Sequence, residues 1–426
     1  MLIRKITLVN YNLNRLYSSI EAKYFELEKT FGAHNYNPLP VVLKRGLGPF
    51  LWDLNDKKYF DFLSAYSSVN QGHCHPEILK ALFNQASKLT LTSRAFYNDT
   101  LGEFEEFVCT LFNYDKVLPM NSGVEAAESA IKLARKWGYE KKRVKKDKAK
   151  IIFPKNNFWG RSIAAISSST NPIAYNNFGP LLYGFETVPY DNLNLLEIKL
   201  KSPDCVAFML EPIQGEAGVI VPSEGYLSSV KYLCNKYNVL FIADEIQTGL
   251  GRTGKILATD YEDAKPDILV LGKALSGGMM PISAVLCNNE IMLCLQPGEH
   301  GSTFGGNPLS AKIAKKSLEV IIDEKLAKNA FELGKLFRSS LNDYISKSST
   351  VKTIRGKGLL NGMVINDNSM ENLAWKICID LMKNGVLARP TNKNVIRFAP
   401  PLVIKKTQIS EAITIIKSTL VKFENK

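Results

Sequence analysis

Short apolar segments alternate with longer amphipathic stretches along the first three quarters of the chain. Each apolar segment has the length of a β-strand and contains few polar positions, a pattern typical of strands in a sheet that is covered on both faces. The alternation with helical stretches predicts an α/β domain built on a mostly parallel sheet. The main predicted strands are residues 116–118, 150–153, 205–210, 239–243, 268–271 and 283–287.

The pattern changes after about Gly306. A long helical stretch covers residues 326–346, residues 351–362 contain three glycines between strand-like flanks, and a final helix begins near Thr407. These features predict a smaller α+β domain, which residues before about Pro49 join. We expect residues 1–20 to be a presequence and residues 21–70 to be an N-terminal segment of the small domain. Residues 71–306 should form the large domain, and residues 307–426 the C-terminal part of the small domain.

Composition narrows the class of protein. The 426 residues are 45% hydrophobic and 22% charged, which is typical of a soluble globular chain, and we find no apolar run of bilayer-spanning length. The formal net charge is +13, and part of the excess lies in the run KKRVKKDKAK at residues 141–150. This run joins a predicted helix to a predicted strand, so it indicates a solvated connection. We therefore predict neither a nucleic-acid nor a membrane partner.

The cysteines and histidines indicate no metal centre. Seven cysteines are scattered along the chain, which is typical of a reduced intracellular protein. The cluster His73-Cys74-His75 resembles a metal-binding pattern, but no second ligand pair stands at zinc-site spacing. Because Gly72 and Pro76 frame the cluster, we interpret it as a turn and predict no bound metal.

The first twenty residues have the composition of a targeting segment. They contain Arg4, Lys5 and Arg15, and the first acidic residue is Glu21. A basic, acid-free and potentially amphipathic N-terminus is typical of a mitochondrial presequence. We predict import into the mitochondrial matrix with cleavage near Tyr17-Ser18. The alternative is a basic, disordered terminus on a cytoplasmic protein.

A carboxylate and a lysine follow two of the apolar strands. In VLFIADEIQTGLGRTG the strand runs into Asp244, and in PDILVLGKALSGG the next strand runs into Lys273. Ligands of open α/β sheets bind at this strand edge, although a single lysine there can also extend to solvent. A buried lysine with a lowered pKa is a nucleophilic amine. Together the pair meets the needs of pyridoxal phosphate, a lysine for its aldehyde and a carboxylate for its ring nitrogen.

A third segment, PMNSGVEAAESA, contains a possible phosphate site. Ser122 and Gly123 form a predicted turn before a helix with apolar residues at helical spacing. Backbone N–H groups at a helix start bind anions, and Ser122 adds a hydroxyl. The alternative is an ordinary capped helix.

These motifs resemble the subgroup of fold-type-I aminotransferases that contains ornithine, acetylornithine and 4-aminobutyrate aminotransferases, from about Gly32 to the C-terminus. The resemblance implies pyridoxal phosphate as cofactor and a large domain with a mostly parallel seven-stranded sheet, plus a smaller α+β domain. It also implies a homodimer with shared active sites, because GEHGSTFGGNP matches the loop that crosses between subunits. The implied cofactor residues are Lys273 (covalent link to the aldehyde), Asp244 (ring nitrogen), Gln247 (phenolic oxygen), Phe158 (ring stacking), Ser122, Gly123 and Val124 (phosphate) and Thr303 (phosphate of the neighbouring subunit).

Three further segments resemble the family members that use ornithine: FGAHNYNPLP, FLSAYSSVNQGHCHP, and EPIQGEAG considered together with IRFAPPLVI. The implied reaction transfers the δ-amino group of L-ornithine to 2-oxoglutarate, giving glutamate-5-semialdehyde and glutamate. Acetylornithine and 4-aminobutyrate are the alternative donors. Met280 stands where the family commonly has an aromatic residue, and Phe304 stands where it commonly has Tyr, so the range of donors stays open. The implied substrate residues are Arg161 (α-carboxylate), Tyr36 (α-amine), Tyr66 (pocket shape), Arg397 (second carboxylate of 2-oxoglutarate), Glu216 (masking of Arg397) and Glu211.

Overall fold

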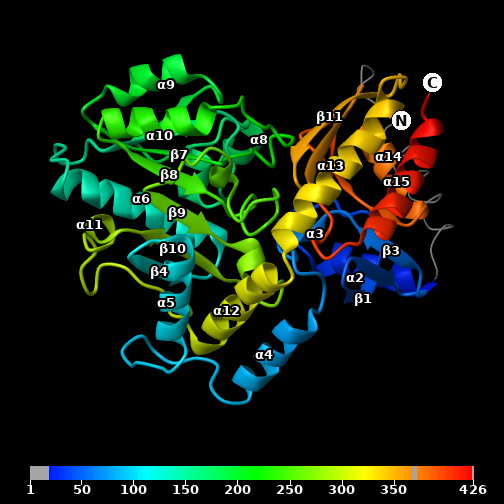
Figure 1. The fold of residues 1–426 in the computed structure, drawn as a ribbon, viewed down its shortest axis with the longest axis horizontal. Coiled ribbons are helices and arrows are strands. Elements are labelled where there is room, and N and C mark those ends of the chain that lie inside the picture. The colour runs from blue at the N-terminus through cyan, green and yellow to red at the C-terminus, as the bar shows by residue number, and fades with distance from the viewer. Residues whose placement is uncertain (1–18, 367–371, 425–426) are drawn as a thin grey trace.

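A seven-stranded sheet forms the centre of the larger lobe of the computed structural model, which describes residues 19–366 and 372–424 (Figure 1). The strand order is β4-β10-β9-β8-β7-β5-β6, and only β10 runs antiparallel to its neighbours. The predicted mostly parallel sheet is therefore confirmed. The strands are β4 (Lys116–Met120), β5 (Lys150–Pro154), β6 (Phe185–Val188), β7 (Cys205–Leu210), β8 (Leu240–Asp244), β9 (Ile268–Leu271) and β10 (Ser283–Cys287).

Burial on both faces explains why these strands are apolar at nearly every position. Along β7, Met209 packs into a cluster that includes residues of helix α6 (Gly123–Glu140), whereas Phe208 packs into a cluster on the opposite face with α10 (Tyr226–Lys236). The edge strand β6, which the pattern did not reveal, is buried only at Val188. Its partial exposure weakens the apolar signal that identified the other strands.

The smaller lobe contains two four-stranded sheets, of order β1-β2-β3-β13 and β11-β12-β15-β14 (Figure 1). Strand β3 pairs in parallel with β13, so the N-terminal segment lies beside a segment more than three hundred residues later in the chain. The strands are β1 (Leu43–Leu47), β2 (Phe50–Asp53), β3 (Lys58–Asp61), β11 (Val351–Lys357), β12 (Leu360–Ile365), β13 (Val386–Leu387), β14 (Arg389–Thr391) and β15 (Val395–Phe398).

Two long helices connect and cover the lobes. Helix α12 packs against α4 and α5, and α13 continues from it along β11 (Figure 1). In the described ranges, no helix is both long and apolar enough to cross a membrane. The remaining helices are α2 (Ser19–Phe31), α3 (Ser64–Ser67), α4 (Pro76–Ala86), α5 (Leu101–Phe112), α7 (Ile163–Ser167), α8 (Pro172–Tyr175), α9 (Leu193–Leu200), η1 (Ala258–Tyr261), η2 (Lys273–Ser276), α11 (Asn289–Met292), α12 (Pro308–Asp323), α13 (Leu326–Ile345), α14 (Leu373–Lys383) and α15 (Lys406–Val421).

The histidine cluster and the basic run both form hydrogen bonds with other segments of the chain. His73 Nε2 lies 2.7 Å from Asp61 Oδ2 and His75 Nε2 lies 2.9 Å from Glu324 Oε1, so each histidine bonds to a carboxylate from another segment. Within the basic run, Lys150 forms an ion pair with Glu186 at 2.9 Å, and Lys142 is only partly exposed. Its Nζ donates to the carbonyl oxygens of Cys205 and Asn238, both at 2.7 Å. The predicted presequence lies almost wholly outside the described residues.

Candidate active site

The carboxyl ends of β8 and β9 bring the predicted carboxylate and lysine together. These strands are parallel neighbours in which Asp244 pairs with Val270, so Asp244 lies at the sheet edge from which Lys273 follows. A cavity of about 170 Å³ opens there. Its lining gathers most of the predicted cofactor residues, namely Gly123, Val124, Phe158, Asp244, Gln247 and Lys273, together with Glu211.

Lys273 occupies a constrained position between two cavities. Its φ of 44° lies in the left-handed region, which a non-glycine residue rarely adopts outside functional sites and turns. It lines both the 170 Å³ cavity and a second cavity of about 360 Å³. Burial lowers the pKa of the Lys273 amine, and the nearby Glu216 and Asp244 carboxylates oppose this shift only in part. The residue therefore has the lowered amine basicity that a nucleophilic lysine needs.

Asp244 is 5% exposed, and its Oδ1 accepts a hydrogen bond from the Ile246 N–H at 3.0 Å. Burial raises the pKa of this carboxyl to about 6, although the backbone N–H and Lys273 both favour the charged form. A cationic ligand atom in the cavity would oppose the effect of burial and hold Asp244 ionised. This carboxylate is therefore suited to pair with a protonated ring nitrogen.

The start of helix α6 borders the second cavity, which Ser122, Gly123 and Lys273 line. Ser122 and Glu125 form a capping box, in which the Ser122 N–H donates to Glu125 Oε2 at 2.6 Å. The ordinary capped helix is therefore present. A Cβ added at Gly123 would lie 3.0 Å from Ile246 Cδ1, so the chain passes close to the residues that follow Asp244. The start of the helix, with its positive dipole end, borders the same space as the lysine.

Phe158 forms a wall of the smaller cavity, and Glu211 holds the backbone beneath it. Glu211 Oε1 accepts from the Phe158 N–H at 3.0 Å and Oε2 accepts from the Gly215 N–H at 3.3 Å. Burial, followed by repulsion from Asp244, raises the pKa of Glu211 to about 8. Glu211 thus lines the cavity with the predicted cofactor residues and is absent from the lining of the larger one described next.

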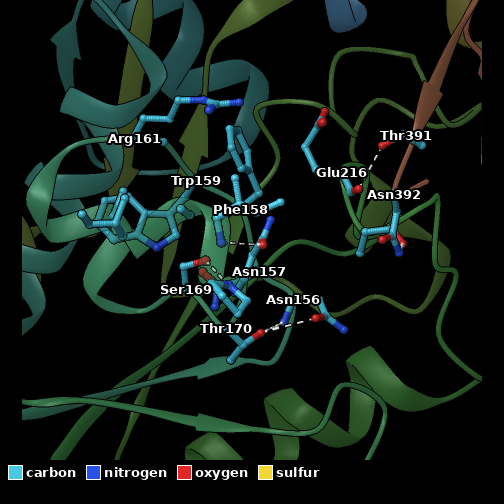
Figure 2. A pocket seen from close by; sticks show the side chains of 18 of the residues that line it. Asn156, Asn157, Phe158, Trp159, Arg161, Ser169, Thr170, Glu216, Thr391 and Asn392 are labelled. Carbon is cyan, nitrogen blue, oxygen red and sulfur yellow. Dashed lines mark hydrogen bonds between the residues drawn. The ribbon is translucent and has the colours of Figure 1, made fainter. Parts of the chain in front are cut away.

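A larger cavity of about 890 Å³ adjoins Phe158. Figure 2 shows Phe158 and Arg161 on one side of it, with Glu216, Thr391 and Asn392 on the other. Five of the six predicted substrate residues line this cavity: Tyr36, Tyr66, Arg161, Glu216 and Arg397.

The predicted Glu216–Arg397 pair forms in the structure. Arg397 Nη1 donates to Glu216 Oε1 at 2.6 Å, and the Tyr66 ring centroid lies 4.7 Å from the guanidinium carbon. Burial would raise the pKa of Glu216, but Arg397 holds it below its ordinary value. The side chain of Arg397 is 2% exposed and that of Glu216 is 32% exposed. The carboxylate therefore has open space into which it can move, whereas the guanidinium does not.

Arg161, which lines this cavity together with the cations Arg389, Lys393 and Arg397, is exposed, and its guanidinium carbon lies 5.8 Å from the Phe158 ring centroid. Among the residues that the structure describes, no carboxylate forms an ion pair with Arg161. Tyr36 is 62% exposed at the same cavity.

Thr303 is exposed and lines neither of the cavities that Lys273 borders.

Sequence reasoning missed two residues that fix the loop carrying Glu216. Thr391 Oγ1 donates to the Glu216 carbonyl at 2.9 Å, as Figure 2 shows, and Asn392 Nδ2 donates to the Ala217 carbonyl at 2.7 Å. Both bonds join segments about 175 positions apart in the chain. No local signal marks such a contact, because Thr and Asn in TNKN are typical of any turn.

Comparison with known proteins gives a family match over most of the chain. Residues 31–420 match the family model described as aminotransferase class-III. The chain is 60% identical over 402 residues to "Ornithine aminotransferase, mitochondrial" of Drosophila ananassae, covering 94% of this chain and 92% of that protein.

Solved structures of two relatives are similar over nearly the whole chain. The ornithine aminotransferase of Toxoplasma gondii ME49 matches with a TM-score of 0.93 at 47% identity, covering 97% of this chain and 98% of that one, and a second structure of the Toxoplasma enzyme is described as having pyridoxal phosphate at partial occupancy. An acetylornithine aminotransferase from Elizabethkingia anophelis matches with a TM-score of 0.87 at 52% identity, covering 95% and 99% of the chains. The fold, the residues gathered at the strand ends and these matches confirm the predicted family: the chain belongs to the class-III aminotransferases.

Proposed function

We propose that this protein transfers the δ-amino group of L-ornithine to 2-oxoglutarate through pyridoxal phosphate, giving glutamate-5-semialdehyde and glutamate. The observation that carries the proposal is the 890 Å³ cavity, which is lined by Arg161, free of any carboxylate partner among the described residues, and by Arg397, which Glu216 masks. The names of the Drosophila and Toxoplasma relatives support the same donor.

Pyridoxal phosphate, the cofactor of this family, supplies an aldehyde that accepts amines and a ring that accepts electrons. The lining residues match its groups one by one. Lys273 provides the amine for the aldehyde, and Asp244 the charge that keeps the ring nitrogen protonated. Once displaced, the Lys273 amine moves a proton from the substrate carbon, as base and then as acid. Phe158 would cover the ring face, Gln247 would contact the phenolic oxygen, and Ser122, Gly123 and Val124 would hold the phosphate at the start of α6.

The donor has two amines, and the cavity must present the distal one. We assign Arg161 to the α-carboxylate and Tyr36 to the α-amine, with Tyr66 shaping the space between them. An unmasked Arg397 would attract the same carboxylate and bring the α-amine to the reacting centre. Its pairing with Glu216 suppresses that alternative pose.

The acceptor poses the opposite problem, because 2-oxoglutarate is a dianion and needs two cations. Arg161 and Arg397 supply them once Glu216 moves aside. The unequal exposure of the pair, 2% for Arg397 and 32% for Glu216, favours movement of the carboxylate. Glu211 acts on the other side of Phe158, where its bonds to the backbone hold the stacking ring in place.

Acetylornithine is the second candidate donor, and the Elizabethkingia match favours keeping it. Acetylation removes the charge of the α-amine, so a cavity suited to acetylornithine has no need of the Tyr36 contact. Rates measured with ornithine, acetylornithine and 4-aminobutyrate as donors distinguish these candidates. Tyr36→Phe should weaken the use of ornithine and leave acetylornithine unaffected.

We further propose that two copies share their active sites. Thr303 lines neither cavity that Lys273 borders, and large apolar side chains are exposed, among them Phe96 (70%), Tyr97 (105%) and Phe304 (55%). A second copy would cover them and receive Thr303 at its phosphate site. Mixing Lys273→Ala and Thr303→Ala protein should therefore restore activity in part, because each mixed dimer contains one intact site. If mixing restores none, the sites are not shared.

We propose mitochondrial import followed by cleavage near Tyr17-Ser18, within the predicted presequence. The Drosophila relative is also named mitochondrial. Mass spectrometry of the endogenous protein should detect a mature N-terminus close to Ser18. Detection of an intact N-terminus in the cytosolic fraction would contradict import.

Absorbance spectroscopy tests the proposed activity. The purified protein loaded with cofactor should absorb in the visible range, and ornithine alone should replace this band with the near-ultraviolet band of the aminated cofactor. Adding 2-oxoglutarate should restore the visible band. A spectrum that responds to acetylornithine but not to ornithine would exclude the proposed donor.

A further inference from the structure

Tyr66 reaches the substrate cavity on an unusual backbone segment. The four residues of α3, Ser64–Ser67, all have positive φ, at 50°, 45°, 62° and 73°. The left-handed conformation crowds the Cβ atom against the backbone, so non-glycine residues adopt it singly rather than in a run. Such a run persists only where its surroundings hold it. This left-handed turn therefore requires a specific anchor.

Asp61, at the end of β3, is that anchor. Its side chain is 3% exposed, and Oδ1 accepts hydrogen bonds from the Leu63 and Ser64 N–H groups, both at 2.8 Å. Its other oxygen, Oδ2, lies 2.7 Å from His73 Nε2, which fixes the carboxylate from the far side. One buried side chain thus satisfies the two backbone donors that open the turn.

The same turn is bonded to Ala399, which directly follows β15, the strand that carries Arg397. Ser64 Oγ donates to the Ala399 carbonyl at 2.6 Å, and the Ala399 N–H donates to the Phe62 carbonyl at 2.7 Å. These bonds bring the Tyr66 ring centroid to 4.7 Å from the guanidinium carbon of Arg397. The guanidinium therefore has an aromatic ring over it, while Nη1 meets Glu216.

We propose that Asp61 is a positioning residue that sets donor selectivity. By holding the left-handed turn, it keeps the Tyr66 ring against Arg397 and so keeps the guanidinium plane turned toward Glu216. When the turn relaxes, the ring withdraws, the guanidinium rotates, and its masking by Glu216 weakens. Glutamate, whose second carboxylate binds Arg397, then competes better with ornithine as the donor. This inference rests on the proposed function.

The chain offers a matched control in Asp53, another buried aspartate of the same lobe. Asp53 is 4% exposed and accepts from the Asn55 and Lys57 N–H groups at 2.9 and 3.0 Å and from the Tyr59 hydroxyl at 2.8 Å. It anchors the turn between β2 and β3 and lines none of the three cavities of the site. Asp53→Ala and Asp61→Ala therefore remove similar bonds from two different turns.

The measurement is the ratio of kcat/KM for ornithine to kcat/KM for glutamate as donor. Asp61→Ala should lower this ratio on the order of tenfold, the effect of losing one cation–π contact of intermediate strength. Asp53→Ala should leave the ratio unchanged whatever it does to stability. Should Asp61→Ala fail to fold, Asp61→Asn, whose amide oxygen can still accept from the turn, should give a smaller fall of the same sign.

A rescue experiment distinguishes displacement of Tyr66 from a general loss of stability in Asp61→Ala. Ala65 lies within the turn at φ 45° and is exposed, so Ala65→Gly loses no packing and removes the Cβ that opposes the left-handed conformation. Added to Asp61→Ala, it should restore part of the ratio. Equal ratios in Asp61→Ala and the wild type, or an equal fall in Asp53→Ala, would overturn the proposal.

A crystal structure of Asp61→Ala tests the turn without reference to any donor. Tyr66 should leave the left-handed region and its ring should move away from Arg397. An unmoved ring at positive φ overturns the inference even if the wild type uses ornithine. A moved ring in a protein whose wild type ignores the δ-amine of ornithine would instead remove the proposed function and leave the positioning role of Asp61 intact.

Discussion

The cofactor side and the substrate side of this site are built in different ways. Asp244 and Lys273 follow neighbouring parallel strands of one sheet, and the strands are buried on both faces. Tyr36, Tyr66, Arg161, Glu216 and Arg397 come from five segments spread over most of the chain and both lobes.

We infer from this difference that the cofactor side is fixed, whereas the substrate side contains side chains that can move. Groups at the ends of a packed sheet hold their geometry, which suits a cofactor that stays bound. The two substrates need different charge arrangements in one cavity, so a carboxylate on a loop, such as Glu216, can change its partner between the two half-reactions. Substitutions on the cofactor side should therefore stop the chemistry, and those on the substrate side should redirect it.

The largest effect is expected at the lysine. Lys273→Ala should lower turnover about 10³-fold or more, because it removes both the covalent link and the proton carrier. The far-ultraviolet circular dichroism should match the wild type, and the visible absorbance with cofactor should be lost. Near-native turnover in this variant would show that another amine acts and would break the assignment of the cofactor side.

The next effect is expected at the carboxylate. Asp244→Asn should still bind the cofactor but lose at least about a hundredfold in turnover, equivalent to about 3 kcal/mol, since the ring nitrogen loses the charge that keeps it protonated. Steady-state kinetics combined with a cofactor titration measures both properties. An unchanged rate would mean that another group protonates the ring.

A smaller and selective effect is expected on the substrate side. Glu216→Ala should unmask Arg397, improve glutamate as donor and permit reaction of the α-amine of ornithine, while the second half-reaction survives. Arg397→Ala should preserve the reaction with ornithine and impair that with 2-oxoglutarate. Because each variant removes one charged contact, we expect the affected rate to change about five- to a hundredfold. Single-turnover measurements of both half-reactions decide, and equal slowing of both by both variants would make the pair purely structural.

The smallest effect concerns stability and pH. Because the pKa of Glu211 is raised from 4.5 to about 8, the folded state favours its protonated form. That stabilisation is complete below about pH 4.5 and is lost as the pH rises through about 8. In the cofactor-free protein, the free energy of unfolding of Glu211→Gln relative to wild type should therefore be higher at pH 9 than at pH 5, by at most about 5 kcal/mol at about 1.4 kcal/mol per pKa unit. Urea unfolding at both pH values measures this difference, and a relative free energy of unfolding that is lower at pH 9 than at pH 5 would contradict the assigned cause.

The same contrast explains how much the sequence could predict. The strands that precede Asp244 and Lys273 are apolar throughout, so their ends, and the residues at them, follow from the pattern. Glu216 and Arg397 were paired only through resemblance to relatives, since nothing local in GEAG or IRFAPP specifies a partner. The left-handed turn at Ser64–Ser67 escaped prediction altogether. Its conformation depends on Asp61 and Ala399, and Ser-Ala-Tyr-Ser has no glycine to mark positive φ.

Isotope transfer tests the central claim most directly. Ornithine labelled with ¹⁵N at the δ-amine is incubated with the cofactor-loaded protein and 2-oxoglutarate, and the products are separated and analysed by mass spectrometry. The account predicts that the label appears in glutamate and is absent from the five-carbon aldehyde product. Unlabelled glutamate, with ¹⁵N retained in the other product, would show that the α-amine reacts and would contradict the proposed masking of Arg397.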